Sequence, residues 1–287
     1  MTAMLAMGLP ASVRAAIFPP LNDPGTSEAR PGKFVWAELF TDDSAAAAKF
    51  YSGVLGWTAV TLDRNGVNYT VFSNGNHPVA GLRQRSAFAA KHASRWVDYI
   101  AVTDIASALS NATKAGGVVR APARDFPRIG SQAIITDPEG SPVGLLKSSS
   151  GDSADGEPAP GDWNWFHLFA KNPQSASEFY RQVFGYDVAP DTRTEKTIQL
   201  LFSSGGLNRG GVAVLPDREG AKPGWVGVIR VANLDEALAR VPALGGEVVV
   251  APHDSAFGSR FALIVDPTGG TVGLVEYINN ANPVTRP

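Results

Sequence analysis

Apolar residues occur along this chain with two different spacings, and each spacing appears in both halves. Ala47, Phe50, Tyr51 and Val54 follow an i, i+3, i+4, i+7 pattern, which predicts a helix that packs one face against a sheet. Short runs rich in β-branched and aromatic residues predict strands. The expected strands are residues 34–40, 68–73, 79–83, 96–102, 131–136 and 143–147, and then 163–169, 198–203, 211–215, 225–231, 260–265 and 272–277. A second helix is expected in each half, over residues 105–114 and 234–244.

The two halves are copies of each other with an offset of 129 residues. When residues 32–57 are set over residues 161–186, nine of the 26 positions are identical, including Gly56 and Gly185, which are expected to end the first helices. The same offset joins the Asp-Pro turns at Asp137 and Asp266. Because the register is kept over more than 100 residues, the chain is predicted to be a tandem repeat of one module.

The segment between the copies is rich in Ser, Gly, Pro and acidic residues, which is typical of a flexible linker. The residues before the first copy are rich in Pro and Gly and are expected to form an unpacked lead-in. The predicted boundaries are a leader at 1–31, a first module at 32–148, a linker at 149–160, a second module at 161–279 and a tail at 280–287.

Each module is predicted to hold two βαβββ units, four in all, so the fold class is α+β. The segments AAAAKFYSGVLGW and SASEFYRQVFGY, with the strand–turn–strand segments ITDPEGSPVGLL and IVDPTGGTVGLV, resemble the vicinal oxygen chelate superfamily of glyoxalases, bleomycin resistance proteins and extradiol dioxygenases. The two-module layout is most similar to the glyoxalase-like proteins of the "hydroxylase" or antigen type. The resemblance implies curled, cup-shaped mixed sheets with helices outside. It does not imply one reaction, because function depends on the site.

The resemblance also implies where a metal would be held, at three strand positions on the inner face of each cup. None of the six side chains at these positions can ligate a divalent cation, which needs His, carboxylate or thiolate groups. The positions are Trp36, Val97 and Gly144 in the first module and Trp165, Val226 and Gly273 in the second. The inherited metal site is therefore predicted to be lost in both modules, and no cofactor is expected.

Glu38 and His167 are the two residues most suited to chemistry. They are repeat-equivalent, and each lies two residues beyond Trp36 or Trp165, so they share the inward face of their strands. In an assembly with pseudo-two-fold symmetry, both are expected to line one cavity. Three roles are open for His167: a buried structural residue paired with Glu38 or a tyrosine, a general base, or a metal ligand. Glu38 is either an acid or base with a raised pKa or a structural partner.

Trp36, Trp165, Trp96 and Trp225 form two repeat pairs on strands. Aromatic side chains at inward positions either fill a core or form the wall of a small-ligand pocket, and Trp rings suit flat aromatic or cationic ligands. Gln132 and Arg260 stand at the start of the strands that precede the Asp-Pro turns. They either reach an anionic or carbonyl group of a ligand or lie at solvated strand ends.

Composition removes several other classes of function. The chain of 287 residues has a net charge of −2 and no cysteine. The near-neutral charge disfavours nucleic-acid binding, and the absence of cysteine excludes disulfides, Cys-ligated zinc and thiol nucleophiles. No apolar run is long enough to cross a membrane. Residues 1–16 resemble the apolar region and cleavage site of a secretory signal without its basic start, so both an exported and a cytoplasmic protein agree with the sequence.

Three functions follow. The first is a metal-independent protein that binds a small aromatic or hydrophobic molecule in a Trp-lined cup. The second is a lyase, isomerase or dioxygenase that uses Glu38 and His167, with or without weakly held Fe, Mn, Ni or Zn. The third is a structural or interaction protein whose cup is filled by its own side chains. Either a monomer or a homodimer agrees with the repeat.

Overall fold

The computed structural model describes residues 18–64, 67–85, 93–192, 199–217, 220–255 and 258–278. The predicted signal at residues 1–16 and the predicted tail at 280–287 therefore lie outside the described residues. The elements of the first module are β1 (Phe34–Thr41), α1 (Ser44–Leu55), β2 (Thr58–Arg64), β3 (Val67–Asn74), β4 (His77–Gln84), β5 (Arg95–Ala101), α2 (Ile105–Lys114), β6 (Val118–Phe126), β7 (Gly130–Thr136) and β8 (Pro142–Ser148). Those of the second are β9 (Trp163–Ala170), α3 (Pro173–Phe184), β10 (Asp187–Pro190), β11 (Gln199–Ser204), β12 (Leu207–Val214), β13 (Gly224–Arg230), α4 (Leu234–Arg240), a 3₁₀ turn (Pro242–Leu244), β14 (Glu247–Asp254), β15 (Ser259–Val265) and β16 (Thr271–Tyr277).

Each module forms one eight-stranded mixed sheet, and the two sheets have the same strand order. The first runs β2-β3-β4-β1-β5-β8-β7-β6, and the second runs β10-β11-β12-β9-β13-β16-β15-β14. In both, the first strands of the two units pair antiparallel at the centre, as β1 with β5 and as β9 with β13. This confirms two tandem modules of the α+β class with two βαβββ units each.

Helices α1 and α3 begin at a capping side chain and end at the predicted glycine. The side chain of Asp43 accepts a hydrogen bond from the backbone N–H of Ala46 at 2.9 Å, and Asn172 caps α3 in the same way. Gly56 and Gly185 end α1 and α3 with φ of 75° and 71°, a left-handed conformation that glycine adopts without strain. These signals fix the direction in which each helix leaves its strand.

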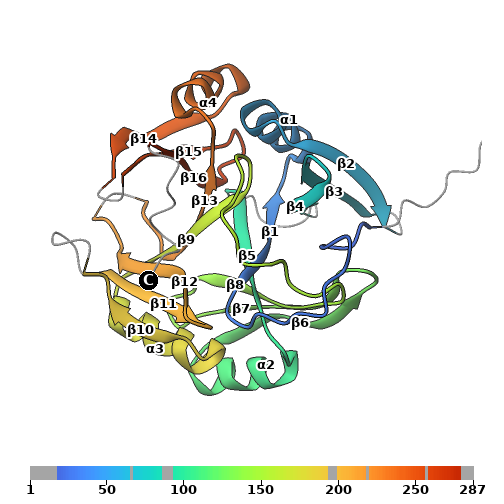
Figure 1. The fold of residues 1–287 in the computed structure, drawn as a ribbon, viewed down its shortest axis with the longest axis vertical. Coiled ribbons are helices and arrows are strands. Elements are labelled where there is room, and N and C mark those ends of the chain that lie inside the picture. The colour runs from blue at the N-terminus through green and yellow to red at the C-terminus, as the bar shows by residue number, and fades with distance from the viewer. Residues whose placement is uncertain are drawn as a thin grey trace, which may run out of the picture.

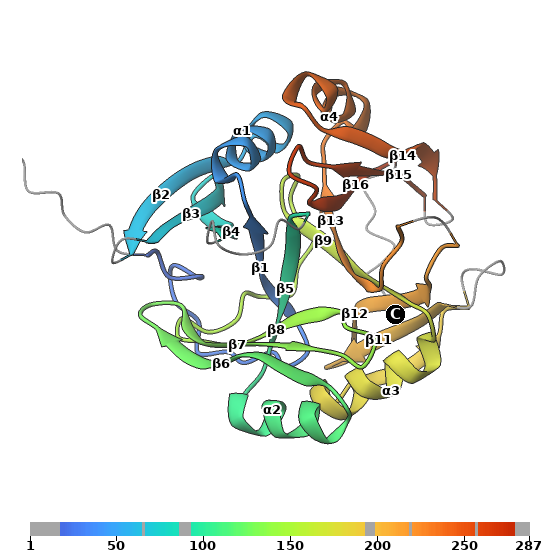
Figure 2. The same cartoon turned by 180° about the vertical axis from the view of Figure 1, so that it is seen from behind.

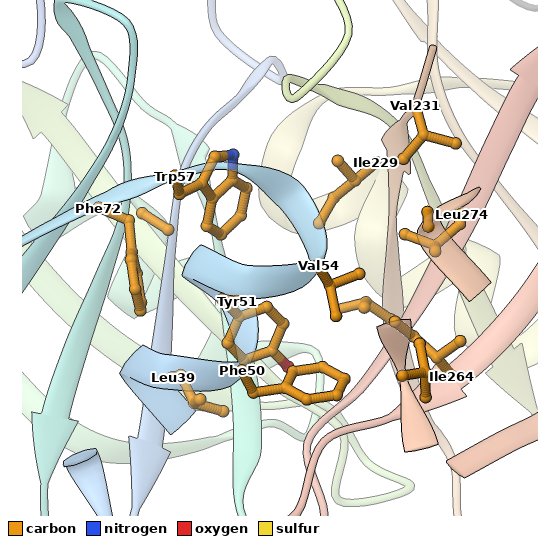
Figure 3. Close-up of a cluster of buried hydrophobic side chains, with 14 of the residues drawn as sticks. Leu39, Phe50, Tyr51, Val54, Trp57, Phe72, Ile229, Val231, Ile264 and Leu274 are labelled. Carbon is orange, nitrogen blue, oxygen red and sulfur yellow. The ribbon is translucent and has the colours of Figure 1, made fainter. Parts of the chain in front are cut away.

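Helices from different modules lie side by side. Figures 1 and 2 show α1 beside α4 and α2 beside α3, from opposite sides of the molecule. Figure 3 shows how Phe50, Tyr51 and Val54 of α1 reach Ile229 of β13 and Ile264 of β15. The first unit of the first module packs in this way on the second unit of the second module. The second unit of the first module packs on the first unit of the second module in a matching core, which contains α2 and α3. The helix-covered faces of the two sheets are therefore buried between the modules.

Hydrogen bonds cross this interface at two equivalent places. The hydroxyl of Tyr51 donates to Oδ2 of Asp266 in the second module at 2.8 Å and accepts from Nε1 of Trp96 at 2.9 Å. The repeat-equivalent set, with distances of 3.2 and 2.8 Å, consists of Tyr180, Asp137 and Trp225. Because all these groups are buried, each bond satisfies a polar atom that would otherwise be desolvated without a partner. The Asp-Pro turns thus join the modules as well as their own strands.

The structure differs from the sequence-based prediction in three respects. Strands β2, β6, β10 and β14, which form the edges of the two sheets, were not predicted by residue number. The helix expected over residues 234–244 ends at Arg240 and continues as a short 3₁₀ turn, because Pro242 lacks an N–H for the helical ladder. The lead-in is packed rather than unpacked, with Phe18 and Leu21 only 5% and 8% exposed. Among the described residues, no helix has the length and apolar character needed to cross a membrane.

Candidate functional site

The inner face of the first sheet is lined by buried side chains. We call this face the first cup; it carries Trp36, Glu38, Val97, Tyr99 and Gln132, all of them buried. The carboxylate of Glu38 is 1% exposed and accepts hydrogen bonds from the hydroxyls of Tyr69 at 2.6 Å and Tyr99 at 2.8 Å. Burial and the neighbouring carboxylate of Glu38 raise the pKa of both tyrosines well above the usual range. Glu38 is thus held as a satisfied buried group.

Aromatic rings occupy the space where a metal-ligating carboxylate would stand in the first cup. A Cβ atom built on Gly144 would lie 2.2 Å from Cδ1 of Tyr99, so no side chain fits at this expected ligand position. A Cβ on Gly81 would likewise lie 1.8 Å from the hydroxyl of Tyr69. The glycines give the two tyrosines the room to reach Glu38. The first cup is therefore built as an aromatic core around one carboxylate.

The inner face of the second sheet has the same strand positions but is more open. We call it the second cup; it carries Trp165, His167 and Phe169 on β9, Val226 on β13 and Phe261 on β15, all partly exposed. On β9 these positions alternate with buried ones, which is the pattern of a strand with one covered and one accessible face. Aromatic side chains thus form much of an accessible wall in this module.

His167 is the polar group at the centre of the second cup. It pairs in register with Gly211 on one side and Val226 on the other, and its ring lies 4.8 Å from the ring of Phe169. Solvent still reaches part of the side chain, as expected for a group on the wall of a cup. Desolvation by the surrounding protein lowers the pKa of His167 to about 4, although the charge of Asp191 opposes the shift. At neutral pH the imidazole is therefore uncharged, with one nitrogen that donates and one that accepts.

The residues present do not fit a divalent metal ion in either cup. The six expected ligand positions hold tryptophan, valine and glycine, and the described part of the chain contains no cluster of three or more His, Asp or Glu residues suited to an ion. In the second cup, a Cβ on Gly273 would lie 2.7 Å from Cε2 of Phe261, so an aromatic ring again takes the place of a ligand. A metal site needs three or more such groups at bonding distance.

Glu38 and His167 do not share a cavity, contrary to our expectation. The contacts of Glu38 come from Tyr69, Tyr99 and Arg83 of its own module. Those of His167 come from the second module. The helix-covered faces meet between the modules, so the inner faces belong to two separate cups. Direct proton transfer between the two groups needs hydrogen-bond reach or one bridging water, and this arrangement does not provide it.

Three of the other residues expected at a ligand site lie elsewhere. Trp96 and Trp225 are buried on the helix-covered faces, where their indoles donate to Tyr51 and Tyr180. Arg260 also faces the helices and forms ion pairs with Asp235 at 2.8 Å and Glu276 at 3.4 Å. Strand alternation is the reason, because each of these residues stands one position away from an inward-facing one.

Gln132, in contrast, faces the first cup and is 5% exposed, without a hydrogen-bond partner for Nε2 among the described residues. Its repeat equivalent is Phe261 in the second cup. Sequence reasoning missed Phe169 and Phe261, although the two-residue spacing from His167 and the repeat offset from Gln132 would have found them. It also missed Tyr99, which the two-residue spacing from Val97 would have found, and Tyr69 and Asp191, for which the sequence carries no separate signal.

Two hollows are lined by neither Glu38 nor His167. One of about 330 Å³ is lined by the N-terminal segment and the linker, including Leu21 and Gly151. The other, of about 370 Å³, lies beside Arg30, Asp155 and Arg209. In the second hollow the arginines pair with Asp155, at 3.1 Å from Arg30 and 2.5 Å from Arg209, so their charges are already matched. Neither hollow brings chemical groups together as the second cup does.

Comparison with known proteins agrees with this geometry. Residues 33–145 and 163–274 each match the family model of the Glyoxalase/Bleomycin resistance protein/Dioxygenase superfamily. The chain is 28% identical over 256 residues to "Putative glyoxylase CFP32" of Mycobacterium tuberculosis, a match that covers 88% of this chain and 98% of that protein. It is 27% identical over 259 residues to "Anthracycline biosynthesis protein DnrV" of Streptomyces peucetius, covering 86% and 94% of the two chains.

Solved structures share the fold at low sequence identity. The Mn(II)-bound glyoxalase from Novosphingobium aromaticivorans superposes with a TM-score of 0.62 at 17% identity, covering 88% of this chain and 84% of its own. The 2,3-dioxygenase LapB from Pseudomonas sp. KL28 gives a TM-score of 0.58 at 14% identity, with 88% and 93% covered. At this identity the likeness concerns the arrangement of elements rather than the chemistry of the site.

Proposed function

The chain belongs to the Glyoxalase/Bleomycin resistance protein/Dioxygenase superfamily, and from this premise we propose that it binds a small aromatic or hydrophobic molecule in the second cup without a metal ion. The observation that carries the proposal is the difference between the two inner faces. At matching positions, Trp36 and Glu38 are 3% and 1% exposed, whereas Trp165 and His167 remain accessible. An accessible aromatic wall around one polar group is typical of small-ligand sites.

The residues of the second cup have distinct roles in this proposal. Trp165 and Phe261 offer flat apolar surfaces against which an aromatic ring packs in stacked or edge-on geometry. His167, uncharged at neutral pH, orients the ligand through one hydrogen bond to a hydroxyl or carbonyl group. A cup of this kind sequesters or presents a ligand without any bond being made or broken.

The similarity to an anthracycline biosynthesis protein supports a polycyclic aromatic ligand. An anthracycline has a flat aromatic ring system that carries hydroxyl and carbonyl oxygens, which suits both the aromatic wall and His167. An enzymatic function that uses His167 as a base is less well supported, because a pKa of about 4 makes the imidazole a weak proton acceptor. Binding is therefore the function that the geometry favours.

The test is isothermal titration calorimetry of an anthracycline with the full chain and with two matched variants, Trp165→Leu and Trp36→Leu. We expect Trp165→Leu to weaken binding about tenfold or more, which corresponds to about 1.4 kcal/mol of lost stacking and apolar contact. Trp36→Leu changes the filled first cup and should leave the affinity within about twofold of the parent. Equal affinity of all three proteins would show that the ligand does not bind in the second cup.

A further inference from the structure

The first cup is closed by a segment that belongs to neither sheet. The ring of Phe18 lies 5.4 Å from the ring of Tyr69 and 6.1 Å from that of Trp36, edge-on to both. Leu21 adds a second buried side chain to the same apolar cluster. We call residues 18–31 the N-terminal strap. In the second module, none of the described residues outside the sheet packs on Trp165 in the corresponding way.

Within the described residues, the strap is attached to the protein without strand pairing. It is held by hydrogen bonds to the start of the linker, from the backbone N–H of Thr26 to the carbonyl of Ser150 at 2.7 Å and from Nδ2 of Asn22 to the carbonyl of Gly151 at 2.6 Å. The backbone N–H of Arg30 donates to the side chain of Asp152 at 2.6 Å. Because no strand hydrogen bonds tie it to the described part of the sheet, the strap can leave the first cup without opening the βαβββ units.

The apolar side chain of Phe18 fills space in this cup but leaves one polar group of the cup without a hydrogen-bond partner in the described part of the chain. Gln132 faces it from β7 beside Leu146, is 5% exposed, and has an Nε2 group without a hydrogen-bond partner among the described residues. A buried amide donor without an acceptor is unfavourable, and the phenyl ring of Phe18 cannot supply one. A ligand with an aromatic ring and one oxygen would fill the position of Phe18 and could also accept from Gln132.

We propose that the first cup is a second small-molecule site, occupied in this structure by Phe18 of the chain itself. The ligand class is a monocyclic aromatic compound with a hydroxyl or carbonyl oxygen. The strap is then an intramolecular competitor, so the first cup takes up a ligand only when Phe18 is displaced. This inference extends the proposed function to the first module, but it does not depend on binding in the second.

Nuclear magnetic resonance of the tryptophan indoles can observe the two cups separately. The chain has six tryptophans. Four of their Nε1 groups donate hydrogen bonds at the module interface, namely those of Trp57, Trp96, Trp163 and Trp225. The other two report on the cups, Trp36 on the first and Trp165 on the second. Phenol is titrated into the ¹⁵N-tryptophan-labelled full chain and into the Phe18→Ala variant, and each signal is assigned by a Trp→Phe variant.

In the parent protein, phenol should shift the Trp165 signal and leave the Trp36 signal in place. In Phe18→Ala, the Trp36 signal should also shift and reach saturation. Adding Gln132→Leu to this variant should weaken phenol binding at Trp36 about threefold to tenfold, as expected for one hydrogen bond. Toluene, which has no oxygen, should bind the two variants equally. If Phe18→Ala does not fold, Phe18→Leu opens less space and should give a smaller shift of the same signal.

Phe184→Ala is the matched control, because Phe184 is 8% exposed but lies in the core around α2 and α3, away from the first cup. It should leave the Trp36 signal unresponsive to phenol. A Trp36 signal that stays silent in Phe18→Ala, or that responds equally in the parent, would overturn the inference. A silent Trp165 signal together with a responsive Trp36 signal in Phe18→Ala would instead count against the proposed function alone.

Discussion

Replacing Asp98 with asparagine is expected to remove a pH dependence from the stability of this protein. Asp98 lies on β5 opposite Ala37, on the helix-covered face of the first sheet. It is 0% exposed, and neither carboxylate oxygen has a hydrogen-bond partner among the described residues. Burial without a compensating charge raises the pKa of Asp98 from 3.8 to about 7.

The direction in which stability changes with pH follows from comparing the protonation of Asp98 in the folded and unfolded chains. Between pH 3.8 and about 7 the unfolded chain loses the Asp98 proton while the folded chain keeps it. The stability therefore falls as the pH rises through this window and is constant with respect to Asp98 above it. A shift of about three units corresponds to about 4 kcal/mol in total, of which about 3 kcal/mol is lost between pH 5 and pH 9.

The assay is urea unfolding followed by tryptophan fluorescence at pH 5, 7 and 9, for the parent and for Asp98→Asn. Asparagine has the size of the protonated acid but cannot ionise, so its stability relative to the parent should grow by about 3 kcal/mol over this range. Contributions of all other titrating groups cancel in the difference. Asn111→Ala, at an exposed position, neither adds nor removes an ionisable group, so it is the control and should show a constant difference. Parallel stability curves for Asp98→Asn and the parent would refute the reasoning.

Other expected outcomes follow from the packing of the two modules. Gly144→Ala should lower the free energy of unfolding by about 1–3 kcal/mol, since the new methyl group would overlap the ring of Tyr99; Gly224→Ala, which meets only a flexible arginine end, should be nearly neutral in the same urea assay. Tyr180→Phe removes the donor to Asp137 and should lower stability by about 1–3 kcal/mol, and a change below about 0.5 kcal/mol would mean that this bond does not hold the modules together. Dialysis against a chelator should leave the thermal melting temperature unchanged, whereas a drop reversed by one divalent ion would reveal a metal that stabilises the fold.

The sequence predicted the central elements of the fold because they carry strong local signals. The helix over 44–55 has an apolar face at regular spacing, a capping aspartate and a terminal glycine, and all three act in the structure. The edge strands carry no such signal. Residues 118–126 of β6 are almost all exposed, so neither a buried face nor an alternating pattern distinguishes them from a loop. Their strand conformation comes from pairing with β7, a contact that spacing along the chain does not encode.

The candidate site was only partly predictable for related reasons. Repeat equivalence placed Trp165 and His167 on an inward face, and the structure agrees. The same strand alternation, applied to Val97 and its neighbour, would have turned Trp96 toward the helices rather than toward a ligand. The sequence could not predict that the first cup is buried and the second is partly exposed. That difference depends on Phe18, which packs on Trp36 through a segment without any periodic pattern.

The most direct test is whether the second cup binds an aromatic ligand when the protein holds no metal. Anthracycline binding is measured by calorimetry on full-length protein dialysed against a chelator, and the metal content of the same sample is measured by mass spectrometry. We predict one ligand per chain with well below one metal ion per chain, and a loss of this binding in Trp165→Leu. Binding that appears only after Mn, Fe, Ni or Zn is restored in stoichiometric amount would contradict a metal-independent second cup.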